Sequence, residues 1–327
     1  MAILITGGAG FIGLNLIEEL ASLGETLIIL SPSRLPLTIQ QAFAQKNISY
    51  EYVQGGVDQE DDLQNLFETY RISKIIHAAA ITADQGRELK HTKEILETNL
   101  MGSVNMFEYA LRYSVDQMIY LSSGSIFGNV GTHDDVIDEH TSPVLPETVY
   151  GISKLAAERL AIRYRNTRGL NVTTVRLGLG YGRWEYDTGH RDTLSLPLQT
   201  YWSAVRGESI VVHEGGGTDY IYGTDIAKGL ALILEKGHSL QPLYHLATGS
   251  IWSLEFWLHN LQKLYPAFQY RLTKHIEECT IGQNGPLPRS PLSIGRIQKD
   301  FSFQADYLGQ KAFDDFILHQ ELLRAIH

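Results

Sequence analysis

The sequence predicts an α/β fold: a doubly wound parallel sheet with helices on both faces, followed by a smaller C-terminal lobe. Short apolar runs alternate with segments of helical periodicity through the first half of the chain. A glycine-rich turn, "TGGAGFIG" (6–13), stands between the first apolar run and the first helical segment. The 327 residues, 43% hydrophobic and 20% charged, have a composition typical of a globular protein with a sizeable core.

The first half supplies the strands and helices of the sheet. Its expected strands are short, apolar and bounded by turn residues: 2–6, 26–30, 48–54, 74–80, 117–123 and 171–178. Its expected helices repeat apolar residues at helical spacing: 11–23, 62–70, 92–113 and 150–169. Gly24 is expected to end the first helix, because glycine readily takes the left-handed conformation found after a helix.

The second half has a less regular pattern, which predicts the smaller lobe. Residues 129–149 and 180–197 are expected to form long loops over the strand ends, and 282–291 a further loop. A strand and a helix are expected within 220–236, and helices at 254–266 and 308–325. We expect parts of this half to cross back to the large sheet.

Charge and cysteine content exclude several classes of function. The net charge of −10 argues against nucleic acid or an anionic membrane as the main partner. The single cysteine, Cys279, cannot form an internal disulfide, which fits a reducing compartment. No run reaches the roughly 18 apolar residues of a membrane span, and the histidines show no metal-ligand spacing. We therefore expect a cytoplasmic protein without a metal.

The glycine turn predicts a dinucleotide site. Gly7 permits a sharp turn, Gly10 lets the backbone approach a pyrophosphate, and Gly13 lets helix and strand pack closely. The expected helix begins with Phe11 and Ile12, and the N–H groups of its first turn favour bound phosphates. The alternative is a plain turn between strand and helix. We expect a Rossmann-type dinucleotide-binding domain over 1–178 and a mainly substrate-binding lobe over 179–327.

The end of the second strand bears on the choice of cofactor. An acidic residue there would bind the adenosine ribose of NAD. The sequence instead reads "LIILSPSR", with Ser31 at the strand end and Arg34 three residues later. Serine and arginine can hold a 2′-phosphate that a carboxylate would repel. This favours NADP over NAD, unless Arg34 is only a solvated loop residue.

A second motif predicts acid–base chemistry. "YGISK" places Tyr150 and Lys154 four residues apart on one face of a helix. An isolated tyrosine keeps its proton at neutral pH, but a neighbouring ammonium favours the phenolate. "YLSSGSIFG" (120–128) ends a predicted strand upstream, so Ser123 can hold the oxygen that Tyr150 protonates. A Y-x-x-x-K pair by itself is common and carries little weight.

Together these motifs resemble the extended short-chain dehydrogenase/reductase family, the NAD(P)-dependent sugar epimerases, dehydratases and reductases. The resemblance also covers "HAAA" (77–80), "NLMGS" (99–103) and "DYIYGTDIA" (219–227). It implies Ser123, Tyr150 and Lys154 as catalytic residues. It implies that Tyr150, Lys154, Ala78, Ala79 and Asn99 lie at the cofactor. It further implies a C-terminal substrate lobe and a homodimer packed through helices at about 92–112 and 150–168.

Four departures from the family pattern narrow the function. Dehydratases of the family carry Asp-Glu after the catalytic Ser or Thr, where this chain has Gly124 and Ser125. Thr218 replaces an arginine that holds the nucleotide-sugar phosphate. In "LGYGR" (179–183) Leu and Arg replace the family's Asn and Pro, and Gly56 replaces an acid that often contacts adenine. These changes disfavour water elimination and weaken the case for a nucleotide sugar.

The substrate side has candidates of its own. Two arginines of "GRWEYDTGHRDTLS" (182–195), Arg183 and Arg191, can hold a carboxylate or phosphate. The remaining candidates carry hydroxyl groups, an imidazole or a carboxylate: Thr82, Ser125, His190, Asp192, Thr193 and Ser195. A solvated loop with internal salt bridges is the alternative.

Three hypotheses follow. The leading one is an oxidoreductase that moves a hydride to or from a secondary alcohol carbon of a sugar or sugar-acid-like molecule. The second is an epimerase that oxidises and re-reduces its substrate with retained NAD. The third is a dinucleotide-binding protein without catalysis.

Overall fold

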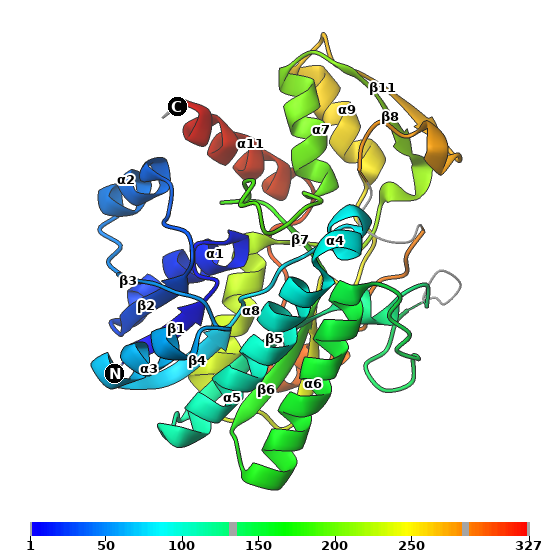
Figure 1. The fold of residues 1–327 in the computed structure, drawn as a ribbon. Helices are drawn as coiled ribbons and strands as arrows, with labels where there is room; N and C mark the ends of the chain where they lie inside the picture. Colours follow the sequence, from blue (N-terminus) through cyan, green and yellow to red (C-terminus); the bar gives the residue numbers. More distant parts are fainter. Residues whose placement is uncertain (1, 131–135, 283–287, 326–327) are drawn as a thin grey trace.

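A computed structural model describes residues 2–130, 136–282 and 288–325. Its main feature is a seven-stranded parallel sheet with the strand order β10-β6-β5-β4-β1-β2-β3 (Figure 1). The strands are β1 (Ala2–Thr6), β2 (Thr26–Ser31), β3 (Glu51–Gln54), β4 (Ile72–His77), β5 (Gln117–Ser123), β6 (Val172–Leu177) and β10 (Leu243–Leu246). The order reverses between β1 and β4, and ligands bind at such a switch point. The predicted doubly wound sheet is confirmed.

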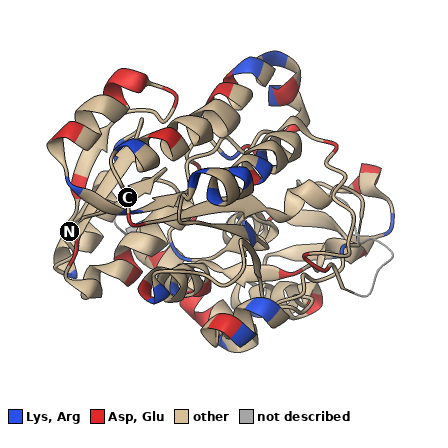
Figure 2. Cartoon of the chain, turned by 90° about the horizontal axis from the view of Figure 1, so that it is seen from below, with Lys and Arg blue, Asp and Glu red and all other residues tan. Residues whose placement is uncertain are grey.

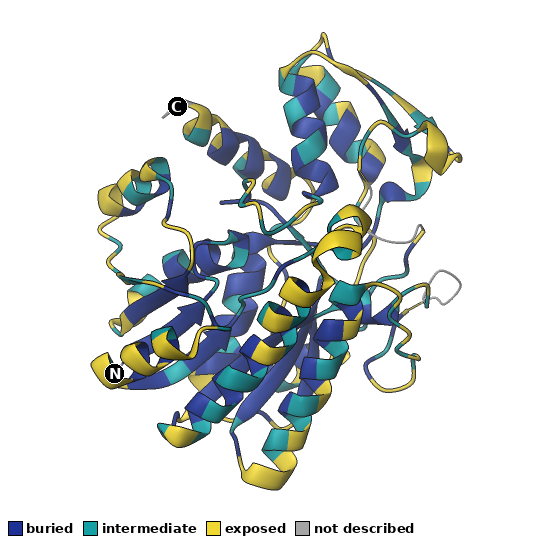
Figure 3. Cartoon of the chain, in the orientation of Figure 1, coloured by how far each residue is buried: buried dark blue, intermediate teal, exposed yellow. Residues whose placement is uncertain are grey.

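Helices cover both faces of this sheet. One layer contains α1 (Phe11–Leu20), α2 (Leu37–Gln45), α8 (Gly223–Lys236) and α10 (Gly295–Phe301). The other contains α3 (Glu60–Thr69), α5 (Gly102–Arg112) and α6 (Val149–Arg168). Successive side chains of a strand point to opposite faces of the sheet, so each strand contributes to a hydrophobic core on both faces. In β1, Ile3 and Ile5 pack into the first layer's core and Leu4 packs into the second layer's core. Figure 3 shows the strands buried between the layers.

The smaller lobe lies above the carboxyl ends of the strands (Figure 1). Its helices are α7 (Leu196–Val205), α9 (Leu254–Leu264) and α11 (Gly309–Ala325). Its two-stranded sheets pair β8 (Ser209–His213) with β11 (Gln269–Thr273), and β7 (Leu179–Tyr181) with β9 (Tyr220–Tyr222). An aromatic core around Trp257 and Tyr201 holds them together. The chain crosses between the lobes, because β10 returns to pair with β6.

Several predicted elements have different bounds. The helix expected over 92–113 is divided into α4 (Gln85–Leu96), a π-helical turn η2 (Glu97–Met101) and α5. Asp84 starts α4 early, because its side chain accepts a hydrogen bond from Arg87 N. The first helix continues as a 3-10 turn, η1 (Ala21–Leu23), and ends at Gly24 with φ of 69° as predicted. Of the predicted loops over 129–149 and 282–291, residues 131–135 and 283–287 lie outside the described residues.

Charged residues of both signs are spread over the helices and loops, while the central strands are mostly uncharged (Figure 2). Across the described residues, no helix combines the length and the apolar character that crossing a membrane requires. In the same ranges, His, Cys, Asp and Glu do not gather into a group of three or more that could hold a metal ion.

Candidate active site

A cavity of about 790 Å³ lies between the carboxyl ends of the strands and the smaller lobe. This volume falls within the roughly 300–1,000 Å³ of ligand pockets. Residues at or just after the ends of β1, β2, β4, β5 and β6 line it. The predicted site residues in its wall are Gly7, Gly10, Phe11, Ile12, Gly13, Ser31, Arg34, Ala78, Ala79, Thr82, Ser123, Ser125, Tyr150, Arg191 and Thr193. The parallel sheet thus brings together motifs that are far apart in sequence.

The glycine turn has the shape that a dinucleotide requires. Gly7 has a φ of +67°, and a Cβ there would lie 2.8 Å from Ala79 Cα. A Cβ on Gly13 would lie 2.4 Å from Gly8 Cα, so only glycine lets α1 approach the turn this closely. Gly10 is the N-cap of α1 and makes no side-chain capping bond. A pyrophosphate fits here, against backbone N–H groups that are left for it.

The ribose end of the cavity lies at the end of β2. Ser31 is buried, and its backbone oxygen accepts hydrogen bonds from Tyr52 Oη at 3.1 Å and Gly55 N at 3.2 Å. Arg34 is exposed, with its guanidinium carbon 5.9 Å from the centre of the Tyr52 ring. A Cβ at Gly56 would lie 2.6 Å from Asp58 Oδ1. Asp58, which also lines the cavity, therefore brings a carboxylate next to position 56, where the family's acid is absent. The sequence motif does not mark Asp58.

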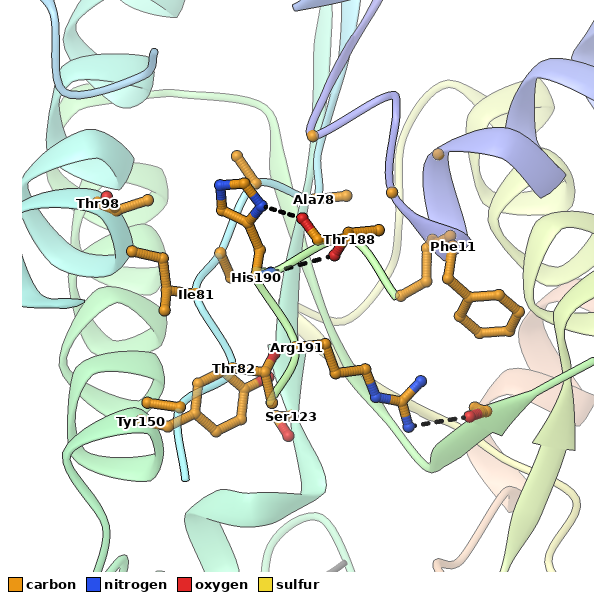
Figure 4. Close-up of a pocket in the computed structure, with 18 of the residues that line it drawn as sticks. Phe11, Ala78, Ile81, Thr82, Thr98, Ser123, Tyr150, Thr188, His190 and Arg191 are labelled. Carbon is orange, nitrogen blue, oxygen red and sulfur yellow. Dashed lines mark hydrogen bonds between the residues drawn. The ribbon is translucent and has the colours of Figure 1, made fainter. Parts of the chain in front are cut away.

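Ser123 and Tyr150 meet at the other end of the cavity (Figure 4). Ser123 ends β5, and its Oγ accepts a hydrogen bond from Ser125 N at 3.1 Å. Tyr150 is the second residue of α6, and its backbone N donates to Glu88 Oε1 at 3.2 Å. Thr82 lies beside the Tyr150 ring in the same view. Two hydroxyl side chains thus adjoin Tyr150 in the cavity.

Lys154 lies behind the cavity wall, one turn beyond Tyr150 on α6. Its side chain is buried, and its Nζ is 4.5 Å from the centre of the Tyr120 ring. Burial lowers the pKa of Lys154 to about 7, against the opposing effect of Glu158. The lysine therefore sits near the midpoint of its titration at neutral pH.

Asn99 also lies behind the wall. Its Oδ1 accepts a hydrogen bond from Ile81 N at 2.7 Å, and its Nδ2 donates to Ile81 O at 2.9 Å. The π-helical turn η2 places this fully buried side chain. The resemblance implied Asn99 at the cofactor, but here it supports the chain that follows β4.

A loop from the smaller lobe crosses over the cavity. Thr82 N donates to His190 O at 2.8 Å, and Asp192 N donates to Thr82 O at 3.0 Å. Tyr186 Oη, which the sequence did not single out, donates to Ala9 O in the glycine turn at 2.7 Å. The loop is thus tied to both ends of the cavity.

The two arginines of this loop differ in position. Arg191 lines the cavity, and its Nη1 donates to Glu185 Oε1 at 3.0 Å. Arg183 does not line it, because Nε bonds to Asp315 Oδ2 at 2.7 Å and Nη2 bonds to Asp315 Oδ1. The predicted substrate contact of Arg183 is therefore corrected to an ion pair within the smaller lobe. Ser195 is likewise the buried N-cap of α7.

Arg289 is a further cavity residue that the sequence reasoning missed. It is 9% exposed, and its Nη2 donates to Gly124 O next to Ser123. Within the described ranges no carboxylate lies at ion-pair distance from it. Burial lowers its pKa to about 10, so it stays charged at neutral pH. A Cβ at Gly124 would lie 3.2 Å from Leu177 O, which leaves little room for an acid there.

Comparison with known proteins identifies relatives of this fold and site. Residues 3–247 match the model of the NAD dependent epimerase/dehydratase family. The chain is 26% identical over 261 residues to the dTDP-glucose 4,6-dehydratase of Streptomyces niveus, covering 76% of this chain and 73% of the relative. The structure of Thermotoga maritima UDP-glucose 4-epimerase with UDP-glucose superposes over 100% of both chains, with TM-score 0.81 and 20% identity. That of Thermus thermophilus UDP-glucose 4-epimerase with NAD covers 98% and 99% of the two chains, with TM-score 0.80 and 22% identity.

Proposed function

Because the chain belongs to the NAD dependent epimerase/dehydratase family, we propose that it moves a hydride to or from a secondary alcohol carbon of a sugar or sugar-acid-like substrate. One observation carries this proposal: Ser123 and Tyr150 share a cavity with the glycine turn, and Lys154 follows one turn after Tyr150 on α6. A nicotinamide dinucleotide, when bound, supplies or accepts the hydride. The protein side of the reaction is then a proton transfer.

Each side chain has a defined part in that transfer. Tyr150 gives a proton to the substrate oxygen or takes one from it. Ser123, held by Ser125 N, orients that oxygen. Lys154, one turn after Tyr150 on α6, is the cation that the motif pairs with this tyrosine.

Water elimination is the less favoured reaction, although the relative from Streptomyces niveus carries the name of a dehydratase. Dehydration needs an acid–base pair after the catalytic serine, where this chain has Gly124 and Ser125. The crowding of position 124 by Leu177 O supports the same view. The buried guanidinium of Arg289, bonded to Gly124 O next to Ser123, favours a substrate that carries an anionic group.

Epimerisation is the second candidate, and the crossing loop favours it. The bond from Tyr186 to Ala9 O and the pairing at Thr82 fasten this loop across the cavity. A cofactor enclosed in this way leaves slowly. An epimerase returns its dinucleotide to the starting oxidation state in each turnover, so it can keep the dinucleotide bound. A dehydrogenase must release the used dinucleotide and bind a new one.

Mass spectrometry of small molecules released from purified, undialysed protein distinguishes the two. Retained NAD(H), together with no net redox change over a panel of sugars and sugar acids, is expected for the epimerase. An empty site and net turnover of added NADP or NAD are expected for the oxidoreductase. An empty site without any turnover would contradict both and favour a binding protein.

We further propose that Ser31 and Arg34 favour NADP. Replacing Arg34 by Ala removes a cation that can pair with a 2′-phosphate, so the Kd for NADPH is expected to rise about tenfold, the effect of roughly 1.4 kcal/mol. The Kd for NADH is expected to stay unchanged. Fluorescence titration with both nucleotides measures this. Lys46→Ala is a control, because Lys46 pairs with Glu18 outside the cavity. An equal loss for both nucleotides would contradict NADP selectivity.

The homodimer and the cytoplasmic location remain predictions from the sequence. Size measurement of the purified protein in solution tests the first of them.

A further inference from the structure

A buried ion pair lies beneath the candidate active site. Arg176 of β6 donates from Nε to Glu158 Oε2 at 2.9 Å and from Nη2 to Glu158 Oε1 at 2.7 Å. The two side chains are 1% and 0% exposed. Burying two charges costs several kcal/mol per ion before pairing offsets it. Packing alone would be served as well by apolar residues, so the pair calls for a second role.

Hydrogen bonds connect this pair to both catalytic elements. Ser122 precedes Ser123 on β5, and its Oγ donates to Glu158 Oε2 at 2.8 Å. Glu158 lies on α6, one turn after Lys154 and two turns after Tyr150. One carboxylate therefore joins the strand that ends at the serine to the helix that carries the tyrosine and the lysine.

The surroundings of Lys154 give the carboxylate an electrostatic role as well. The groups around it are Glu158 from its own helix, Tyr120 from β5 and His77 from β4. Burial lowers the pKa of His77 to about 3, so that imidazole is neutral. Glu158 is the acidic group that favours the ammonium form of Lys154. Arg176, from β6, donates to both oxygens of this carboxylate.

We propose that Glu158 is a positioning residue of the site, which fixes α6 against β5 through Ser122 and Arg176 and favours the ammonium form of Lys154. Its consequence for turnover rests on the proposed function. Its effect on Lys154 does not, because the charge of that lysine can be followed in protein without cofactor or substrate.

The test uses two variants, because a single change at Glu158 would leave Arg176 buried and unpaired. The double variant Glu158→Gln/Arg176→Met removes both charges. Ser122→Ala removes one neutral hydrogen bond from Glu158 and leaves the charges in place. Thermal melts followed by circular dichroism show whether each variant is folded.

The first measurement is an NMR titration of the Lys154 ε-methylene, assigned by its loss in Lys154→Arg. Wild-type protein is expected to titrate near pH 7. In the double variant the midpoint is expected to fall by about one pH unit or more, since loss of a nearby opposite charge disfavours the ammonium. Ser122→Ala is expected to keep the wild-type midpoint. An unchanged midpoint in the double variant would overturn the electrostatic role.

The second measurement is the pH profile of kcat. The alkaline loss of activity is expected to move to lower pH in the double variant. Ser122→Ala is expected to lower kcat with no movement of the profile and no change in KM. A kcat equal to wild type would overturn the positioning role. Wild-type protein without turnover would contradict the proposed function, and the NMR titration would still decide the effect on Lys154.

Discussion

Replacing Tyr150 by Phe is expected to lower kcat by about 10²- to 10⁴-fold, the usual contribution of a positioned acid–base group. The ring keeps its place, because the backbone N of Tyr150 is bonded to Glu88 and the residue lies in the first turn of α6. Only the hydroxyl that carries the proton is lost. Dinucleotide affinity and the melting temperature are expected to stay unchanged. Steady-state kinetics and a fluorescence titration measure these quantities.

Tyr244→Phe is the matched control. Tyr244 lies on β10 away from the cavity, and its Oη donates to Asp300 Oδ2 at 2.7 Å. Loss of this buried bond is expected to lower the free energy of unfolding by about 1 kcal/mol and to leave kcat unchanged. If both variants keep wild-type kcat, Tyr150 is not the acid–base group. If Tyr150→Phe also loses dinucleotide affinity, its hydroxyl holds the cofactor and the kinetic loss has another cause.

The strand ends explain why most of the cavity wall could be predicted. Gly7, Ser31, Ala78 and Ser123 follow four parallel strands, and such strands present their carboxyl ends at one edge. The local signals were also sufficient for these strands, since each is a short apolar run with a turn after it.

The errors concern side chains whose partners are distant in sequence. Arg183 bonds to Asp315, 132 residues later, and Arg289 bonds to Gly124, 165 residues earlier. Nothing near either arginine in sequence distinguishes a contact within the protein from a ligand contact. Lys154 lies one turn after Tyr150 on α6, and its side chain packs against Tyr120 of a neighbouring strand. Helical spacing alone cannot show which turn of that face the cavity reaches.

Gly7→Ala is expected to have the second large effect. Gly7 belongs to the glycine motif, has a left-handed φ and lies in the cavity wall. The left-handed φ of +67° costs an L-residue about 1–2 kcal/mol. The new Cβ would also lie 2.8 Å from Ala79 Cα and 2.9 Å from Ala79 N, and these backbone atoms cannot move without shifting the end of β4. The variant is expected to lose more than 2 kcal/mol of unfolding free energy, roughly the strain and the clash together. Dinucleotide binding is expected to be lost, since the turn must open.

Gly169→Ala separates strain from crowding. Gly169 follows α6 with a φ of +73°, and a Cβ there would meet no heavy atom within 4 Å. It shares the backbone conformation of Gly7 without the contact, so urea unfolding is expected to report only the strain of about 1–2 kcal/mol. Fluorescence titration is expected to give wild-type dinucleotide affinity. The difference between the two variants then measures what the approach of the turn to Ala79 contributes. If Gly7→Ala behaves like Gly169→Ala in both experiments, the close approach is incidental and the turn does not cradle a pyrophosphate.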